Sequence, residues 1–251
     1  MTPDEKVAHM ERLYPLLCEH GQAYCRSHPS IFRRSKQFPA LYFSSADFQG
    51  MGEWLVGVMI CRKNEMRKGM FTVVGIQKFY VTRGKKENIG AGFYLGHCDG
   101  DVVICREYPP HFVNRFRERF IAPKGIVQPT FTELVRRIIT EDFFGMDYTF
   151  SGVFCGLEDG KVQFEYIPEI LHQKGYQDLA SFQREGIAYG VASPNRRYFC
   201  FTTYVGDADL TATQRERLSA ARRLHREHEF RHQKDPTDDA TGIELVDPAK
   251  R

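Results

Sequence analysis

The sequence predicts an α+β fold: an antiparallel meander sheet with helices packed on one side, an N-terminal helix and a basic C-terminal helix. Three observations support this prediction. Aromatic residues make up 13% of the chain, with 20 Phe and 12 Tyr, and such residues favour strands. Apolar residues follow helical spacing near the N-terminus, and then form short strand-like runs. The turns between these runs are too short for crossover connections, so neighbouring strands must be antiparallel.

The N-terminal helix is predicted over residues 3–27, because its apolar positions recur every three or four residues. Thr2-Pro3 provides a suitable start, and His28-Pro29 ends the pattern. Pro15 lies inside the run, where a proline kinks or splits a helix. Residues 30–50 are predicted to form a loop with one short apolar run at 41–43.

Four strands are then predicted from runs rich in Val, Ile, Phe and Tyr, at 53–62, 70–83, 89–98 and 101–107. Asp99-Gly100 separates the last two runs and is a strong hairpin signal. Two prolines follow, at a position that helix starts favour. Further elements are predicted in the order helix 110–121, helix 130–144, strands 148–157 and 161–167, a short helix or loop within 168–184, and strands 186–192 and 196–205.

The C-terminal part is predicted to form a basic helix over 211–234, and the polar residues after it are predicted to be disordered. These patterns divide the chain into four parts. They are an N-terminal helix and meander region (1–107), a compact α+β unit (108–205), the basic C-terminal helix (206–234) and the tail (235–251).

Charge, cysteine content and hydropathy limit the class of protein. The formal charge of +3 permits an anionic partner without requiring one. Seven scattered cysteines and no signal-peptide pattern predict a reduced, cytoplasmic protein, and no apolar run is long enough to span a membrane. The stretch from Cys18 to His28 holds two Cys and two His, but their spacing is unlike that of zinc sites. We therefore predict no metal and no cofactor.

The segment 108–120, YPPHFVNRFRERF, carries the main functional candidates. On a helix, His111, Arg115 and Arg119 form one stripe, and Phe112, Phe116 and Phe120 form the adjacent apolar stripe. Two guanidinium groups one turn apart can grip a phosphate, and a histidine beside them can transfer a proton near pH 7. A solvated basic face explains the same spacing.

The predicted strand 196–205 adds a second set of candidates. Thr202 and Thr203 place hydroxyl groups on both faces of the strand, and one of them could donate a hydrogen bond to a phosphate. Arg196 and Arg197, at the tip of a predicted hairpin, are candidate contacts to a nucleic-acid backbone, as is Arg117. Ordinary strand residues and an exposed turn are the alternative interpretations.

The order of these elements resembles the barnase/EndoU/colicin/RelE-like group of nucleases, in particular its phage and mobile-element members. The resemblance covers about residues 108–205: a helix with His-x-x-x-Arg-x-x-x-Arg, a second helix, the glycine-marked segment REGIAYGV (184–191), and a late strand with Thr-Thr. It implies metal-independent RNA cleavage, with His111 as general acid or base and Arg115 and Arg119 binding phosphate. The implied partners are RNA and a cognate inhibitor or antitoxin.

The sequence also departs from this group. No second catalytic histidine is evident, so the other acid or base would be Glu118, Tyr204 or water. Two other functions therefore stay open: a nucleic-acid-binding or protein-binding module without catalysis, and an accessory or assembly protein of a phage. Cleavage requires the candidates to converge in one concave site, whereas binding requires only a basic surface.

Overall fold

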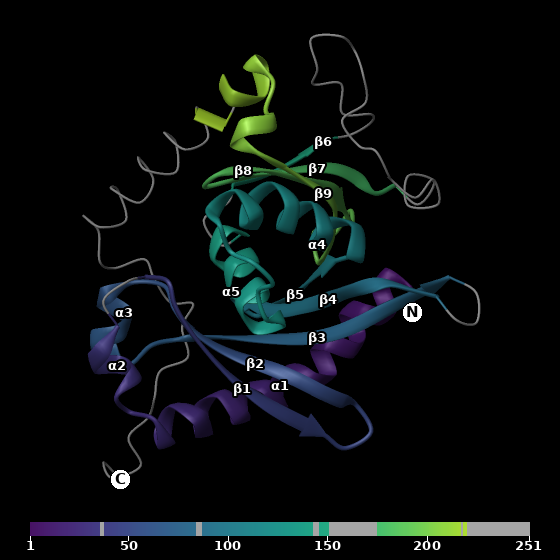
Figure 1. The fold of residues 1–251 in the computed structure, drawn as a ribbon. Coiled ribbons are helices and arrows are strands. Elements are labelled where there is room, and N and C mark those ends of the chain that lie inside the picture. Colours follow the sequence, from purple (N-terminus) through teal and green to yellow (C-terminus); the bar gives the residue numbers. More distant parts are fainter. Residues whose placement is uncertain (36–37, 84–86, 143–145, 151–174, 217, 220–251) are drawn as a thin grey trace. The chain divides into compact units, whose positions relative to one another are not determined.

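The computed structural model describes residues 1–35, 38–83, 87–142, 146–150, 175–216 and 218–219. The chain divides into two compact units. The first comprises residues 1–78 and 94–105, and the second comprises residues 79–93 and the described part of the chain after 105. Both contain helices and antiparallel strands, which confirms the predicted α+β class (Figure 1).

In the first unit the helix α1 (Pro3–Ser27) covers the strands β2 (Gly52–Ile60) and β3 (Thr72–Arg83). The helix begins as predicted: Thr2 accepts a hydrogen bond from the backbone of Glu5, whose side chain accepts one from the backbone of Thr2. Pro15 lies inside α1 without ending it. The apolar face of the helix, including Leu13 and Leu17, is fully buried on the sheet and forms the core of this unit.

The loop predicted for residues 30–50 is wrong. These residues contain the short helix α2 (Ile31–Arg34) and the strand β1 (Ala40–Phe48), which pairs antiparallel with β2 over its whole length. The sequence FSSADF in β1 carries too many polar residues to give a strand signal. The backbone pairing with β2, rather than side-chain character, therefore determines that strand.

The remaining strands of the meander agree with the predictions. β2 and β3 are joined through the short helix α3 (Lys63–Lys68), and β4 (Glu87–Asp99) and β5 (Val102–Tyr108) follow. The hairpin between β4 and β5 has Gly100 at φ +59°, where a glycine is favoured. β4 and β5 contribute residues to both units.

In the second unit the strands β6 (Met146–Phe150), β7 (Gln177–Gln183), β8 (Gly186–Ala192) and β9 (Tyr198–Gly206) form antiparallel neighbours in the order β9-β8-β7-β6. The end of β5 lies beside β9: Tyr108 stacks on Phe201 with 5.1 Å between ring centroids. β7 corrects the helix or loop predicted within 168–184. The strand predicted at 161–167 lies outside the described residues.

Two helices cover one face of these strands, namely α4 (Pro110–Phe116) and α5 (Phe131–Asp142) (Figure 1). α4 continues into a π-helical turn, η1 (Arg117–Ile121), and a short 3-10 turn, η2 (Ala122–Lys124). The opposite face of β8 and β9 is covered by the start of the predicted C-terminal helix, where Gln214 donates a hydrogen bond to the hydroxyl of Tyr189 at 3.0 Å. The rest of that helix and the tail lie outside the described residues.

Candidate functional site

The helix α4 is anchored by the three phenylalanines that the sequence places on one stripe. Phe112, Phe116 and Phe120 are buried. Phe116 meets the ring of Tyr204 on β9 edge-on, with 4.9 Å between centroids, and stacks on Phe120 at 4.6 Å. The apolar stripe predicted from the sequence therefore packs on β9, and the opposite side of α4 faces outward.

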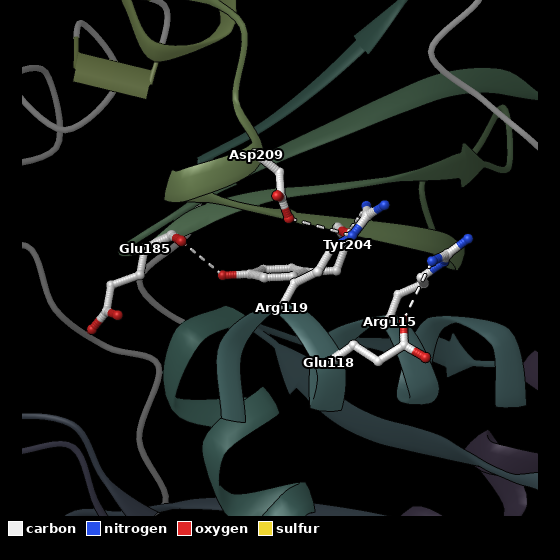
Figure 2. A network of polar contacts seen from close by, with 6 residues as sticks. All are labelled: Arg115, Glu118, Arg119, Glu185, Tyr204 and Asp209. Atoms are coloured by element: carbon white, nitrogen blue, oxygen red, sulfur yellow. Dashed lines mark hydrogen bonds and ion pairs between the residues drawn. The ribbon is translucent and has the colours of Figure 1, made fainter. Parts of the chain in front are cut away.

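Three of the candidate residues in this segment are exposed or partly exposed. His111 and Arg117 are exposed. Arg115 is about one third exposed and pairs with Glu118, with 3.3 Å between Nη1 and Oε2 (Figure 2). This pair joins residues three apart on an exposed surface, where such ion pairs contribute little to stability. We call these three surface residues, His111, Arg115 and Arg117, the basic face; His111 and Arg115 are one turn apart on the same stripe, whereas Arg117, two residues after Arg115, flanks them on a different side of the helix.

Arg119 does not belong to the basic face, because its side chain is held by β9. Its Nη1 donates to the backbone carbonyl of Tyr204 at 2.7 Å, and its Nε lies 3.5 Å from the Asp209 carboxylate (Figure 2). The i→i+5 hydrogen bond from Ala122 to Arg117 widens the helical turn that contains Arg119. The three-residue stripe predicted from the sequence therefore stops before Arg119, whose guanidinium stabilises the end of β9.

This role gives a prediction about stability. Replacing Arg119 with alanine leaves the partly buried Tyr204 carbonyl without its charged donor, so we expect a loss of about 1–3 kcal/mol in the free energy of unfolding. Replacing Arg117, which is exposed, should change stability by no more than about 0.5 kcal/mol. Urea denaturation of both variants measures the difference. Equal effects would show that Arg119 does not stabilise the strand.

Thr202 and Thr203 are buried, and the structure does not bring them to the basic face. Thr203 lies opposite Tyr189 in the β8–β9 register, whereas Tyr204, the next residue, faces α4. Since neighbouring strand residues point to opposite faces, the Thr203 side chain is directed away from α4. Thr202 is the extra residue at a β-bulge, and its hydroxyl donates to the carbonyl of Tyr189 at 3.2 Å. Both threonines therefore belong to the sheet.

Arg196 and Arg197 lie in the turn between β8 and β9, as predicted. Arg196 is exposed and has φ +54°, and the Arg197 backbone N–H donates to the Asn195 side chain at 3.1 Å. Tyr204 lies seven residue steps along the extended strand from Arg197, a distance of about 23 Å. These arginines are therefore at the end of β9 opposite to the Arg119 contact, and they do not extend the basic face.

The charged cluster around Glu141 is a feature that the sequence reasoning missed. Glu141 on α5 is only 4% exposed, and its Oε2 has no hydrogen-bond partner. Burial, reinforced by the nearby Glu185 carboxylate, raises the pKa of Glu141 to about 7, while Arg184 and Lys124 act in the opposite direction. Lys124 pairs with Glu185 at 2.6 Å. The available signal was the position of Glu141, three residues after Ile138 on the apolar side of α5.

Glu185 connects this cluster to β9. Its backbone carbonyl accepts a hydrogen bond from the Tyr204 hydroxyl at 2.9 Å (Figure 2). The same carbonyl accepts a second hydrogen bond from the Asp207 N–H at 3.1 Å. The phenol that was one candidate for the second acid or base is therefore buried and bonded to the backbone. Its hydroxyl proton is donated to the Glu185 carbonyl and not toward His111.

No family model, curated protein or solved structure matches the chain. Within the described part, no three His, Cys, Asp or Glu side chains gather in an arrangement that could hold a metal ion. His20 of the Cys18–His28 stretch bonds Ser44 at 2.9 Å, and Cys25 is buried in the core. Among the described helices, none has the length and apolar character needed to cross a bilayer.

Proposed function

We propose that the protein binds RNA through the phosphate backbone, with the basic face of α4 and η1 as the contact surface. The observation that supports this most directly is the contrast between the two sides of α4. Three buried phenylalanines fix the helix to β9, while His111, Arg115 and Arg117 are exposed or partly exposed over the rest of its surface. A fixed helix presents its cations to phosphates with little loss of conformational entropy. A cytoplasmic location and a cognate inhibitor or antitoxin belong to the same proposal.

Binding is favoured over cleavage because the other groups of the predicted site have different roles. Arg119 holds β9, Thr203 faces away from α4, and the hydroxyl of Tyr204 is bonded to Glu185. One observation favours metal-independent RNA cleavage as a second candidate. Arg115 lies one turn after His111 and pairs with Glu118. An imidazole, a guanidinium and a carboxylate therefore share one helix surface. His111 and Glu118 would then exchange protons with the 2′-hydroxyl and the leaving oxygen.

RNA binding can be measured by fluorescence anisotropy with a labelled single-stranded RNA at several salt concentrations. We expect the double variant Arg115→Ala/Arg117→Ala to bind RNA more weakly. The negative slope of log K against log salt should also become less steep by about 1.4, since each phosphate contact in a single strand contributes about 0.7. Arg67→Ala/Lys68→Ala removes the same charge from exposed positions on α3 and serves as the control. Equal losses in both variants would indicate a response to net charge alone and would contradict the proposed surface.

Cleavage is tested separately by incubating total RNA with the wild type and with His111→Ala in EDTA. Fragmentation by the wild type that His111→Ala abolishes would establish the second candidate. Intact RNA with both proteins, together with the salt-dependent binding described above, would establish binding without catalysis. Neither binding nor fragmentation would leave the protein-binding and assembly alternatives.

A further inference from the structure

Two cysteines of the first unit lie beside the same tyrosine hydroxyl. Tyr14 lies on the buried face of α1. Its hydroxyl donates a hydrogen bond to the carbonyl of Val73 at 2.8 Å and accepts one from the backbone N–H of Cys98 at 3.1 Å. Cys18 follows Tyr14 by one helical turn and so occupies the same side of α1. Hydrogen bonding from the Tyr14 hydroxyl lowers the pKa of both thiols against the effect of burial, which is consistent with Cys18 and Cys98 lying beside it. The tyrosine thus brings together thiols that are 80 residues apart in the sequence.

The two thiols also interact electrostatically. A negative charge on Cys98 raises the pKa of Cys18, in addition to the effect of burial. Both cysteines are free and partly exposed, and both pack at the edge of the core between α1 and the sheet. Cys25 and Cys105, in contrast, are almost fully buried. A small oxidant in solvent therefore has access to this pair but not to those two core cysteines.

We propose that Cys18 and Cys98 form a redox-sensitive pair, which a peroxide converts into a disulfide that links α1 to β4. One thiolate sulfur attacks a peroxide oxygen, the O–O bond breaks, and the departing hydroxide takes a proton to become water. The sulfenic acid left on the first sulfur is then attacked by the second thiolate. Its S–O bond breaks, a second water leaves, and the S–S bond forms. Two electrons pass from the two sulfurs to the peroxide.

The surroundings of the pair predict how fast it reacts. Burial raises the pKa of Cys18 to about 11 and also raises that of Cys98, and the aspartates at 99 and 101 reinforce the effect on Cys98. Because the thiolate is the reacting form, we expect oxidation to be slow at neutral pH and to accelerate as the pH rises toward 9. The pair should therefore remain reduced until peroxide persists. This inference does not depend on the proposed RNA binding.

The test treats the full-length protein with hydrogen peroxide at pH 7 and pH 9, blocks remaining thiols with an alkylating agent under denaturing conditions, and maps the unreduced peptides by mass spectrometry. We expect a peptide pair joined through Cys18 and Cys98 as the main product, with the mass of two hydrogens lost, forming faster at pH 9. Cys18→Ser and Cys98→Ser should each abolish it. Cys61→Ser is the control and should leave the product unchanged. Cys61 is also partly exposed, but the charges that affect its pKa are those of Glu65 and Arg62, not those of Cys18 or Cys98.

Two results would overturn the proposal, and both are read from the wild-type protein, so they hold even where a variant fails to fold. The first is the absence of the Cys18–Cys98 peptide pair. This holds whether peroxide has oxidised other thiols or has left every thiol intact. The second is its appearance at the same yield as pairs that include Cys25, Cys61 or Cys105. The latter pattern would indicate random pairing in unfolded chains.

Discussion

Replacing Phe116 with alanine is expected to lower the free energy of unfolding of the second unit by about 3–5 kcal/mol, as for other large aromatic side chains removed from a core. Phe116 is fully buried, and its ring contacts Phe112, Phe120 and Tyr204. Truncation removes the apolar surface that joins α4 to β9 and leaves a cavity between them. Urea denaturation followed by far-ultraviolet circular dichroism measures the loss.

The same variant tests the connection between α4 and RNA binding. If the basic face depends on a docked helix, Phe116→Ala should weaken RNA binding even though no charge is removed. Phe116→Leu, which keeps most of the buried volume, should be less damaging, and Asn114→Ala, at an exposed position on the same helix, should have no measurable effect on stability. A loss below about 1 kcal/mol for Phe116→Ala would contradict the packing described for α4.

Replacing Glu141 with glutamine is expected to stabilise the protein above pH 7 and to remove part of its pH dependence. Burial and the Glu185 carboxylate raise the folded-state pKa of Glu141 to about 7, compared with 4.5 for an unperturbed carboxyl. Below the unfolded pKa the group is protonated in both states and costs nothing. As the pH rises from 4.5 to 7 the unfolded chain ionises first, so stability falls, by up to about 3 kcal/mol once the folded carboxyl also ionises.

Denaturant midpoints of the wild type and Glu141→Gln at pH 4 and pH 8 measure this effect. We expect similar stabilities at pH 4 and a more stable variant at pH 8. Glu133→Gln on the same helix provides a contrast of opposite sign. Hydrogen bonds from Thr130 lower the pKa of Glu133, so its contribution is present above its unfolded pKa and is lost as the pH falls through the folded value. Parallel pH profiles for wild type and Glu141→Gln would contradict the assignment.

The elements that could be predicted are those whose signal is contained in their own residues. α1 carries a capping sequence at Thr2 and a long apolar period, so the prediction over 3–27 matches its observed bounds. β8 was predicted with its observed bounds, because a run of apolar residues lies between turn signals. α5 begins where Thr130 and Glu133 exchange hydrogen bonds, a pattern visible in the sequence.

The strands that were missed are those that depend on a neighbour. β1 is rich in polar residues and forms because its backbone pairs with β2 at every position from Ala40 to Phe48. β7 places Asp178, Ser181 and Gln183 in a buried strand between β6 and β8. Residues of these types are depleted in strands, so local propensity argues against the structure that long-range hydrogen bonding imposes.

The sequence by itself determined that 110–121 forms an amphipathic helix, with phenylalanines on one side and cations on the other, because helical periodicity is a local property. Only the tertiary structure decided what each cation does. The π-helical turn and the end of β9 draw Arg119 away from the stripe to the carbonyl of Tyr204. The β-bulge at Thr202 and the strand register direct both threonines into the sheet. Residue spacing cannot reveal these contacts, because they depend on which strand faces the helix and in which register.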